Sequence, residues 1–558
     1  MNTPALSIPG GKYITRRDVI ATTTTPGATI RYTTNGAEPT ETDEAAPGNG
    51  LIVVDRSMTL RVKAFKSGIA PSPTAAGRYA ITGAIQAGAA FMVGLKADKT
   101  VWAWGINNLG QLGRGNVVTP RTSPVQTPGL TDIEAIAVGA NHVIALKTGG
   151  TLVGWGLNSS GQLGISNTSN RTSPVPIPSL SNVKAIAAGD NFSMALLGNG
   201  EVWTWGNNAF SQLADGTTST RTTPIKSHYA TTPTPVQIAA GNVFSIVRFD
   251  DGTVMASGAG ALGATVATSV NPVSALLPAG VTEIFAGRGQ TAFAVVTQGA
   301  ATQLFGWGLD NQGQLGIGLP IGVEQTPLFI AIGKTQVGVG ANQVIFGGFG
   351  AGLAGAGPAS SGELGLGFSP ILPASLSRMA PIPSAIQTIG LTAGANFSAA
   401  LCIDGSVWTW GLGSNGQAGQ GSTVNIFVPT RIAGFSLVSN TAATNDTDGD
   451  GLADGIEWAI GTDPQLADTN GDGIDDGAAL LLGQSPTTLD SDGDGLTDAQ
   501  EAIIGTNPYL ADTDRDGVPD GLEAYPLDPT RSSNTPNPND HTPPVITLLK
   551  PVTATPIP

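Results

Sequence analysis

The acidic residues between Asn445 and Arg531 have types and spacing that could bind a metal ion. Four copies of a loop begin at Asp446, Asp468, Asp490 and Asp512, a period of 22 residues: DTDGDGLADGIE, DTNGDGIDDGAA, DSDGDGLTDAQE and DTDRDGVPDGLE. Oxygen-bearing side chains recur at loop positions 1, 3, 5 and 9. Gly stands at position 6 in every copy, and Glu stands at position 12 in three copies. This is the ligand spacing of a calcium loop, in which the backbone carbonyl at position 7 supplies a further oxygen.

The spacing therefore predicts calcium as the cofactor of all four loops. The predicted ligands are Asp446, Asp448, Asp450, Leu452, Asp454 and Glu457; Asp468, Asn470, Asp472, Ile474 and Asp476; Asp490, Asp492, Asp494, Leu496, Asp498 and Glu501; Asp512, Asp514, Asp516, Val518, Asp520 and Glu523. Ala479 replaces the last Glu of the second loop, so we expect weaker binding there. Composition alone favours an acidic disordered linker, but that alternative does not explain the fixed period. Without the ion, self-repulsion is expected to leave the segment disordered, so that binding and folding are one event.

The charge of the chain is concentrated in this segment. Residues 445–531 hold 21 Asp and Glu against two Arg, a net of -19, whereas the whole chain carries -15, so the remainder is near +4. Only 12% of all residues are charged and Gly (77) and Pro (39) are abundant, which favours an all-β repeat protein. No basic patch stands out, so we expect no nucleic-acid partner. No apolar run is long enough for a membrane helix, and the single Cys402 excludes an intrachain disulfide.

Residues 83–440 contain an internal repeat. The fold of this repeat would position any functional surface outside the acidic segment. An apolar strand follows a glycine seven times, as in "GANHVIAL", at Gly88, Gly139, Gly189, Gly241, Gly287, Gly340 and Gly394. Further phrases, such as "TLVGWGLNSSGQLG" and "RTSPV", follow in most copies. A period near 50 residues with several strand-like runs is typical of a propeller blade, so seven copies predict seven blades closing a ring. Alternating pairs such as Trp102 and Trp104 should place one ring on each face of a strand and pack between blades.

These phrases closely resemble the regulator of chromosome condensation repeat, and the resemblance implies a seven-bladed propeller. That family includes a secreted bacterial inhibitor of β-lactamases and a nuclear nucleotide-exchange factor, but likeness of fold transfers neither activity. Two copies depart from the pattern: within residues 241–263 the strand reads "TVMASGAGALG" without Trp, and within residues 340–367 the sequence reads "FGGFGAGLAGAGPASSGELGLG". We expect those two blades to be irregular or to carry loops with another purpose.

Residues 1–82 read as a small β domain, because "TIRYTTN", "LIVVD" and "TLRVKAF" alternate apolar with polar residues. From residue 4 onward they resemble the small domain beside the catalytic domain of chitobiase-type hexosaminidases, which implies a β-sandwich accessory module without a catalytic pair. The aromatics Tyr13, Tyr32, Phe65 and Tyr79 are expected in its core. The acidic segment, residues 441–531, resembles the bacterial thrombospondin type 3 repeat, which implies a calcium-dependent rod.

The two ends of the chain indicate a piece of a larger polypeptide. Residues 532–558 begin as a Pro/Asn-rich linker, and "TPPVITLLKP" looks like the first strand of a truncated immunoglobulin-like domain. The start, "MNTPALSIPGGKY", shows no signal peptide.

No motif of catalysis is present. His142 belongs to the first strand phrase, where other copies have Phe or Gln, and we expect it to be structural. His228 and His541 lie in Pro/Thr-rich loops, and Cys402 is expected to be buried.

The sequence thus predicts a mainly β protein: a seven-bladed β-propeller preceded by a small β-sandwich and followed by a calcium-binding rod. We expect no enzymatic activity. The predicted role is that of a secreted or cell-surface modular protein of bacterial type, with the propeller as a platform for an unknown protein or glycan partner and the rod as a spacer. Two alternatives stay open: the accessory region of a larger carbohydrate-active enzyme, and a propeller-type protein inhibitor or regulator.

Overall fold

The structure is a computed structural model, and its contacts group the chain into two units, Met1–Leu489 and Asp490–Pro558. It describes residues 1–55, 57–298, 301–317, 322–347, 353–367, 374–378, 388–438, 446–450, 452, 457, 462–482, 486–490, 494–506, 513, 518–523 and 525–528.

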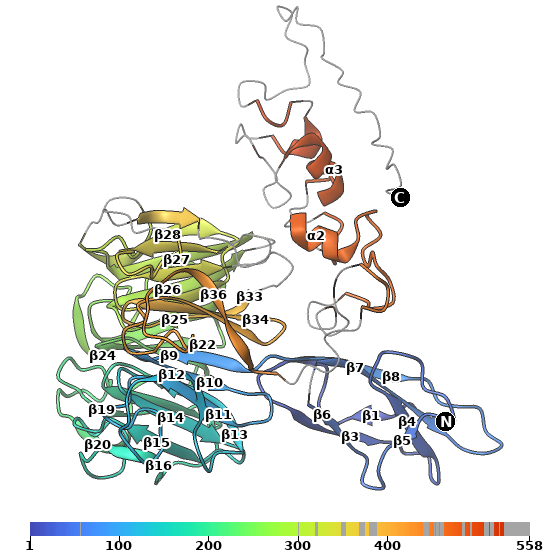
Figure 1. The fold of residues 1–558 in the computed structure, drawn as a ribbon, viewed down its shortest axis with the longest axis horizontal. Coiled ribbons are helices and arrows are strands. Elements are labelled where there is room, and N and C mark those ends of the chain that lie inside the picture. The colour runs from blue at the N-terminus through green and yellow to red at the C-terminus, as the bar shows by residue number, and fades with distance from the viewer. Residues whose placement is uncertain are drawn as a thin grey trace, which may run out of the picture. The chain divides into compact units, whose positions relative to one another are not determined.

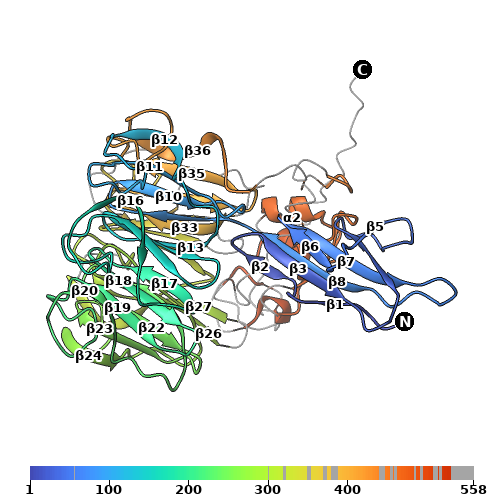
Figure 2. The same cartoon turned by 90° about the horizontal axis from the view of Figure 1, so that it is seen from below.

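The N-terminal strands form two sheets packed face to face, drawn in blue in Figure 2. One sheet has the order β1 (Ala5–Leu6), β3 (Arg17–Thr22), β6 (Leu51–Val54), and the other the order β2 (Gly11–Tyr13), β8 (Ala75–Ile81), β7 (Met58–Phe65), β4 (Thr29–Thr33), β5 (Glu44–Ala45). Alternate residues of β3, including Val19, are buried, because successive side chains of a strand point to opposite faces. Tyr79 and Phe65 are buried and Tyr13 and Tyr32 pack against the same cluster, so the predicted sandwich with aromatics in its core is confirmed.

The repeat region forms, among the described residues, seven four-stranded antiparallel sheets, which we number in chain order. Each runs from an inner to an outer strand: β9 (Ala84–Ala87), β10 (Phe91–Leu95), β11 (Val101–Gly105), β12 (Arg121–Gln126); β13 (Ile133–Val138), β14 (His142–Lys147), β15 (Leu152–Gly156), β16 (Arg171–Ile177); β17 (Val183–Ala188), β18 (Phe192–Leu197), β19 (Val202–Gly206), β20 (Arg221–Lys226); β21 (Pro235–Ala240), β22 (Phe244–Phe249), β23 (Val254–Ala259), β24 (Thr268–Ser274); β25 (Val281–Ala286), β26 (Thr291–Gln298), β27 (Ala301–Leu309), β28 (Val323–Ile332); β29 (Gln336–Val339), β30 (Val344–Gly347), β31 (Ala354–Gly357), β32 (Ala374–Arg378); β33 (Thr388–Ala393), β34 (Phe397–Cys402), β35 (Ser406–Gly411), β36 (Ile426–Ser436).

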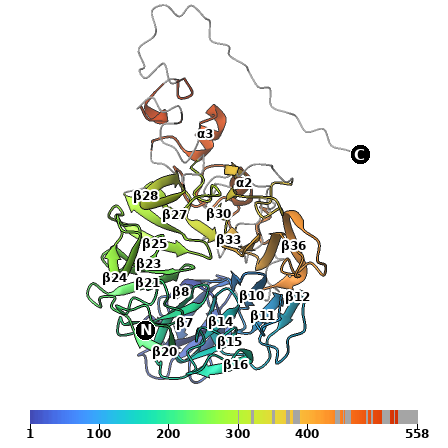
Figure 3. The ribbon, with the colours of Figure 1, turned by 90° about the vertical axis from the view of Figure 1, so that its left-hand side faces the viewer.

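The sheets stand around a common axis, and the orange strand β36 lies near the blue strand β12 in Figure 3. Each inner strand contacts the next one, and β33 contacts β9. Backbone bonds between the inner turns link successive sheets: Ala89 N donates to Ala140 O (2.9 Å), Ala140 N to Asp190 O (3.1 Å), and Ala395 N of the last sheet to Ala89 O of the first (3.0 Å). The ring is therefore closed, and the prediction of a mainly β fold with a propeller is confirmed.

The glycine that opens each strand phrase is required by the close approach of neighbouring sheets. A Cβ on Gly139 would lie 2.5 Å from Gly189 O, and one on Gly189 would lie 2.4 Å from Gly241 O. Since real Cβ atoms do not approach so closely, any side chain at these positions would push the inner strands apart.

The second tryptophan of each regular copy packs between sheets. Trp104, Trp155 and Trp205 are fully buried. Each indole Nε1 donates to a carbonyl of the preceding sheet; Trp155 bonds Gln111 O at 2.9 Å, and Trp104 closes the ring by bonding Gln417 O of the seventh sheet at 3.0 Å. The first tryptophan of each pair, such as Trp102, is half-buried and lies on the same face, where Trp102 and Trp104 both pack against Phe435. The prediction that the two rings of a pair lie on opposite faces is therefore wrong, because residues two apart on a strand share a face.

The fourth sheet has Ser257 where the regular copies have this tryptophan, since Ser257 pairs with Ser245 as Trp205 pairs with Ser193. Tyr229, from the connection between β20 and β21, fills the space and is 4% exposed. Its hydroxyl donates to Ser245 O at 2.8 Å. A side chain from outside the repeat phrase thus seals the gap between the third and fourth sheets.

In the sixth sheet, a residue of the sheet itself takes the place of the missing tryptophan. Ala356 pairs with Val344, as Trp155 pairs with Val143 in the second sheet, and therefore stands at the tryptophan position. Phe346 lies on the same face, two residues along β30, where the second sheet has Ala145. It is fully buried and packs edge-on against Phe293 of the fifth sheet, with ring centroids 5.5 Å apart.

The sandwich and the propeller are joined at Glu134 of β13. Its Oε2 accepts hydrogen bonds from Thr15 Oγ1 (2.9 Å) and Arg17 Nη1 (2.7 Å), and its Oε1 accepts one from Lys99 Nζ (2.7 Å). Val438, which follows the last propeller strand, belongs to the hydrophobic core of the sandwich. The second propeller sheet and the residue that follows the last sheet are thus both tied to the N-terminal module.

The acidic segment forms short helices between its loops. The described ones are α2 (Asp476–Leu482), α3 (Asp498–Ile504) and the 3-10 helix η1 (Asp520–Leu522); Figure 1 labels α2 and α3. Thr497 and Gln500 form a capping box at the start of α3, and Gly505 ends the helix in the left-handed conformation (φ 88°).

Candidate metal centre

The first loop folds around its own carboxylates. Gly449 N donates to Asp446 Oδ1 (2.7 Å), Asp450 N to Asp448 Oδ1 (3.3 Å) and Leu452 N to Asp450 Oδ1 (2.7 Å). One oxygen from each of Asp446, Asp448 and Asp450 lies within 4.8 Å of the others. The alternation of Asp with small residues lets three carboxylates converge on one side of a tight turn.

A second group crosses from the first copy to the second. Oxygens of Asp450, Glu457 and Asp476 lie within 4.8 Å of one another, and Asp476 is the first residue of α2. Gly477 N donates to Asp450 Oδ2 at 2.9 Å, which fixes the helix start against the first loop. Asp450 is half-buried, whereas Glu457 and Asp476 are fully buried.

The third and fourth copies repeat this arrangement. Oxygens of Asp494, Glu501 and Asp520 lie within 4.8 Å of one another, and all three residues are buried. Gly521 N donates to Asp494 Oδ2 at 2.8 Å. In both groups the partner from the next copy lies 26 residues after the first Asp, so the copies are joined in pairs.

The donor set of both groups suits a hard cation, because it consists of carboxylate oxygens. Burial, followed by repulsion from Asp450 and Asp468, raises the pKa of Asp476, although Thr469 donates to it from Oγ1 (2.6 Å) and N (2.8 Å). Burial likewise raises the pKa of Asp450, and Asp448 and Asp446 add to the shift. A divalent cation would lower the pKa values of these carboxylates, since it favours their charged form.

The second loop behaves differently from the first. Asp468 accepts bonds from Gly471 N (2.8 Å) and Gly473 N (2.9 Å), and Asn470 Nδ2 donates to Asp472 Oδ2 (2.9 Å). Among the described residues these three do not join a group of converging carboxylates. Its position-9 residue, Asp476, accepts hydrogen bonds from Thr469 of its own loop and also converges with Asp450 and Glu457 of the first copy. The sequence did not predict this contact with the first copy.

The remaining predicted ligands are distributed as follows. The structure describes Leu452, Ile474, Leu496 and Val518, whose carbonyls were predicted as ligands, together with Asp490 and Glu523. The side chain of Asp498 and the residues Asp454, Asp492, Asp512, Asp514 and Asp516 lie outside what is described. Thr469 and its equivalent Thr513, which donates to Asp520 from Oγ1 (2.6 Å), were not predicted as site residues. The recurrence of Thr or Ser at loop position 2 was the available signal.

His142 is held as a neutral side chain inside the propeller. It is fully buried, and its Nε2 lies 3.0 Å from Ser193 Oγ. Ser193 Oγ donates its own hydrogen to Gln162 O (2.9 Å), so in the contact between the two side chains His142 Nε2 is the donor and Ser193 Oγ the acceptor. Burial, followed by the charge of Arg288, lowers the pKa of His142 to about 3. The imidazole cannot take the hydroxyl proton of Ser193, which favours the structural role expected for it.

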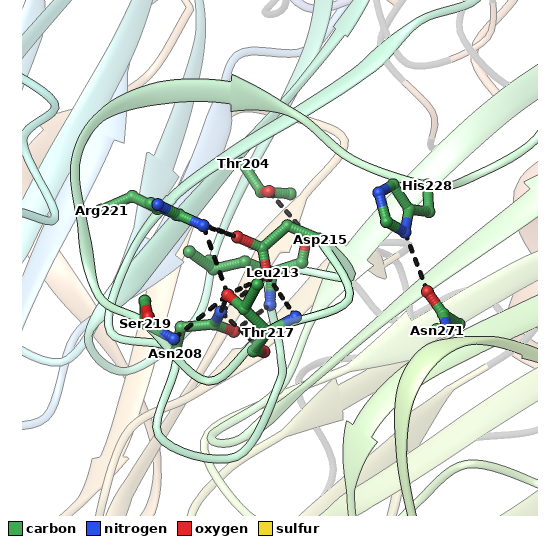
Figure 4. Close-up of polar contacts among 9 residues, drawn as sticks. All are labelled: Thr204, Asn208, Leu213, Asp215, Thr217, Ser219, Arg221, His228 and Asn271. Atoms are coloured by element: carbon green, nitrogen blue, oxygen red, sulfur yellow. Dashed lines mark hydrogen bonds and ion pairs between the residues drawn. The ribbon is translucent and has the colours of Figure 1, made fainter.

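Cys402 is buried, as expected from the sequence, whereas His228 is exposed. Burial, followed by the charge of Asp404, raises the pKa of Cys402 to about 12, so the thiol stays protonated. His228 is exposed, and its Nδ1 lies 2.8 Å from Asn271 Oδ1 (Figure 4). His541 lies outside the described residues.

Family models match three parts of the chain. The chitobiase/beta-hexosaminidase C-terminal domain matches residues 8–76. The regulator of chromosome condensation (RCC1) repeat matches residues 98–146, 149–196, 199–247 and 404–443, and a second model of that repeat matches 84–111, 133–162, 183–212 and 389–417. The bacterial TSP3 repeat matches residues 446–467 and 490–511. All three resemblances predicted from the sequence are thus confirmed.

Curated relatives match over short stretches. The human probable E3 ubiquitin-protein ligase HERC3 is 40% identical over 75 residues, which is 13% of this chain and 7% of that protein. Human protein RCC2 is 34% identical over 82 residues, 14% of this chain and 15% of that protein. The chain therefore spans only a small part of the length of the relatives it matches.

Solved structures match over the propeller. Yeast RCC1 (Prp20) in complex with Kap60 is similar with a TM-score of 0.54 and 24% identity, over 63% of this chain and 86% of that one. Human WBSCR16 is similar with a TM-score of 0.52 and 22% identity, over 60% of this chain and 93% of that one. At this identity the likeness establishes the fold alone. In the part of the chain that the structure describes, no helix is long and apolar enough to cross a membrane.

Proposed function

We propose that this chain is a non-enzymatic modular protein of the cell surface or extracellular space. Its propeller and sandwich would present a fixed platform to a protein or glycan partner, and its acidic repeats would form a calcium-dependent spacer. The observation that carries the proposal is the convergence of buried carboxylates from paired copies, Asp450 and Glu457 with Asp476, and Asp494 and Glu501 with Asp520.

Calcium is the ion that these groups suit best. Carboxylates buried together at this density repel each other, and a divalent cation with a preference for oxygen converts that repulsion into attraction. Because each group draws ligands from two copies, the ion would fix one copy against the next and stiffen the segment. Loops of this kind fill where free calcium is roughly millimolar, which supports an extracellular location.

The loops between the third and fourth propeller strands support the platform role. Large apolar side chains are exposed there in several sheets, although singly exposed apolar residues are common on soluble proteins. They are Val117 (51% exposed), Val118 (53%), Phe210 (52%), Val266 (42%), Ile317 (36%) and Val424 (65%). Such residues would supply the apolar part of a protein interface.

The test is a calcium titration of the full chain by calorimetry and circular dichroism, with magnesium and chelator controls. We expect saturable binding of at least one ion for each pair of copies, with a gain of ordered structure. Binding that is absent at roughly millimolar calcium would make the segment an acidic linker and remove the main support for the extracellular location.

The accessory region of a larger carbohydrate-active enzyme is a second candidate, favoured by the match of residues 8–76 to the hexosaminidase-type domain. A glycan array probed with the full chain distinguishes it. Selective glycan binding that disappears when the sandwich is removed would favour this candidate over the platform for a protein partner.

A further inference from the structure

The inner strands of the propeller enclose a chamber of about 200 Å³ on its axis. Most lining residues are Gly, Ala and Val, and the polar side chains are those of Gln86, Asp190, Arg288 and Thr392. Gln86 Oε1 accepts a bond from Val138 N (3.1 Å) and Thr392 Oγ1 accepts one from Ala87 N (3.0 Å), so both join neighbouring inner strands. Asp190 and Arg288 are the charged residues of the lining.

Arg288 is an inserted residue. In six copies the opening glycine N donates to the carbonyl oxygen three residues later, as Gly139 N does to His142 O, whereas Gly287 stands four positions before Thr291, the first residue of β26. Leu309 N donates to Gln290 O (2.7 Å), as Leu157 N donates to Asn141 O (2.8 Å), so Gln290 corresponds to Asn141 and Gly289 to Ala140. Gly289 therefore takes the regular place in the ring, and Arg288 is the additional residue.

The side chain of Arg288 leaves the fifth sheet and crosses the axis to the second and third. Its Nη1 donates to Gly139 O (3.1 Å) and its Nη2 to Asp190 Oδ1 (2.6 Å). The side chain of Arg288 is 9% exposed and that of Asp190 is 21% exposed. The charged pair thus lies at the chamber, between sheets that are not neighbours.

The ring does not need this pair in order to close. Ala89 and Ala140 are equivalent to Asp190 in the first and second sheets, and their carbonyl oxygens accept the same backbone bonds without a charged side chain. Burial raises the pKa of Asp190, against the influence of Arg288, which is the signature of a desolvated carboxylate. A buried ion pair often contributes less than an apolar replacement, so its presence here calls for a role other than stability.

A second pair in the same propeller shows what a purely structural ion pair looks like (Figure 4). Arg221 donates to Asp215 Oδ2 from both Nε (2.9 Å) and Nη2 (2.7 Å). Asp215 Oδ1 accepts from Asn208 Nδ2 (2.9 Å) and from Thr217 Oγ1 (2.7 Å). Both carboxylate oxygens are therefore used, and the loop between β19 and β20 is fixed.

The Arg288–Asp190 pair differs, because one guanidinium nitrogen rather than two bonds the carboxylate. Among the described residues the guanidinium donates two hydrogen bonds, and only Oδ1 of Asp190 accepts one from it. A guanidinium has further N–H groups in a planar fork that matches a carboxylate, and a carboxylate has further lone pairs for a donor. The chamber thus offers a positive donor and a negative acceptor side by side.

We propose that this chamber binds a small zwitterion of the α-amino-acid class. The ligand carboxylate accepts hydrogen bonds from Arg288, and its ammonium group donates to Asp190. Because the protein pair is neutral as a whole, a ligand without net charge leaves no uncompensated charge in the chamber. The volume is several times the roughly 30 Å³ of one water and below the roughly 300 Å³ at which drug-sized pockets begin, so the ligand is small.

The test is calorimetric titration of the full chain with glycine and with L-alanine. We expect saturable binding at one site, and weaker binding of acetate and of methylammonium, which each carry half of the ligand's charges. Arg288→Ala is expected to raise the dissociation constant by about tenfold or more. Arg221→Ala, which removes an ion-paired arginine outside the chamber, is the matched control and should leave binding unchanged.

Three results would overturn the proposal: no saturable binding of either amino acid, equal binding to wild type and Arg288→Ala, or acetate binding as tightly as glycine. Circular dichroism establishes that each variant folds. If Arg288→Ala does not fold, Asp190→Asn takes its place with the same criterion, because it preserves the volume of the side chain and removes the negative charge that the ligand ammonium needs. Arg288→Lys is measured beside it, since it keeps the positive charge but loses the planar fork of donors.

Discussion

Tyr229 Oη donates a hydrogen bond of 2.8 Å to Ser245 O, at the place where the regular propeller sheets bury a tryptophan. Tyr229 comes from outside the repeat phrase, yet it joins the hydrophobic cluster that binds the third sheet to the fourth. In the fourth sheet Tyr229 therefore fills the space that a tryptophan fills in the regular sheets, so the absence of the tryptophan is compensated there. Phe346 does the same for the sixth sheet.

This relationship predicts a large effect at Tyr229. Tyr229→Ala removes a buried ring and should lower the free energy of unfolding of the propeller by about 3–5 kcal/mol, whereas Tyr229→Phe loses only the hydroxyl bond and should cost about 1 kcal/mol. Urea unfolding followed by tryptophan fluorescence measures both. Phe210→Ala, at an exposed site of the same sheet pair, is the control and should change stability by less than about 0.5 kcal/mol. An equally small effect of Tyr229→Ala would contradict the assignment.

The pairing of the acidic copies predicts a difference between two adjacent carboxylates. Asp476 converges with Asp450 and Glu457, whereas Asp475 is exposed and belongs to none of the carboxylate groups among the described residues. Asp476→Asn should weaken calcium binding roughly ten- to a hundredfold or more, because even groups that only support a metal ligand have effects of that size. Asp475→Asn should leave affinity nearly unchanged. Calcium titration of the two variants compares them, and equal affinities would mean that the copies bind independently.

His142 predicts a specific loss of stability in acid. Its pKa is about 3 in the folded chain against an ordinary value of 6.5, so the unfolded chain binds the proton first as the pH falls. The wild type should therefore lose about 1.4 kcal/mol per pH unit between 6.5 and 3, or about 2 kcal/mol at pH 5. The third sheet has Phe192 at the position equivalent to His142. His142→Phe should therefore lack this loss of stability in acid. Parallel stability profiles of the two proteins between pH 7 and pH 5 would count against it.

Glu134 predicts a loss of stability in acid at a lower pH than the loss that His142 predicts. Burial raises its pKa, but hydrogen bonds from Lys99, Arg17 and Thr15 outweigh this and hold the pKa at about 2 against an ordinary 4.5. Its contribution is present above pH 4.5 and is lost as the pH falls from 4.5 toward 2. Glu134→Gln should therefore be less stable than wild type at neutral pH, with a difference that shrinks in acid. Scanning calorimetry from pH 6 to pH 3 tests this, with the exposed Glu41→Gln as control.

The sequence alone determined the repeating parts of this protein. The glycine and tryptophan phrases predicted strands, turns and buried rings, and the structure places Trp104, Trp155 and Trp205 between sheets for that reason. The spacing of Asp, Gly and Glu predicted a metal loop and its ligand types. These features depend on local geometry, such as strand alternation and tight turns, and are therefore readable residue by residue.

The tertiary structure alone decided which distant residues meet. Asp476 joins Asp450 and Glu457 because the short helix α2 begins against the preceding loop, and a period of 22 residues does not reveal that contact. Tyr229 and Arg288 carry no repeat signal, since each lies outside the regular phrases. Tyr229 meets Ser245 of the next sheet, 16 residues away, because neighbouring sheets stack. The partner of Arg288 is set by closure of the ring, which brings Asp190 to it across 98 residues, and no local pattern encodes that closure.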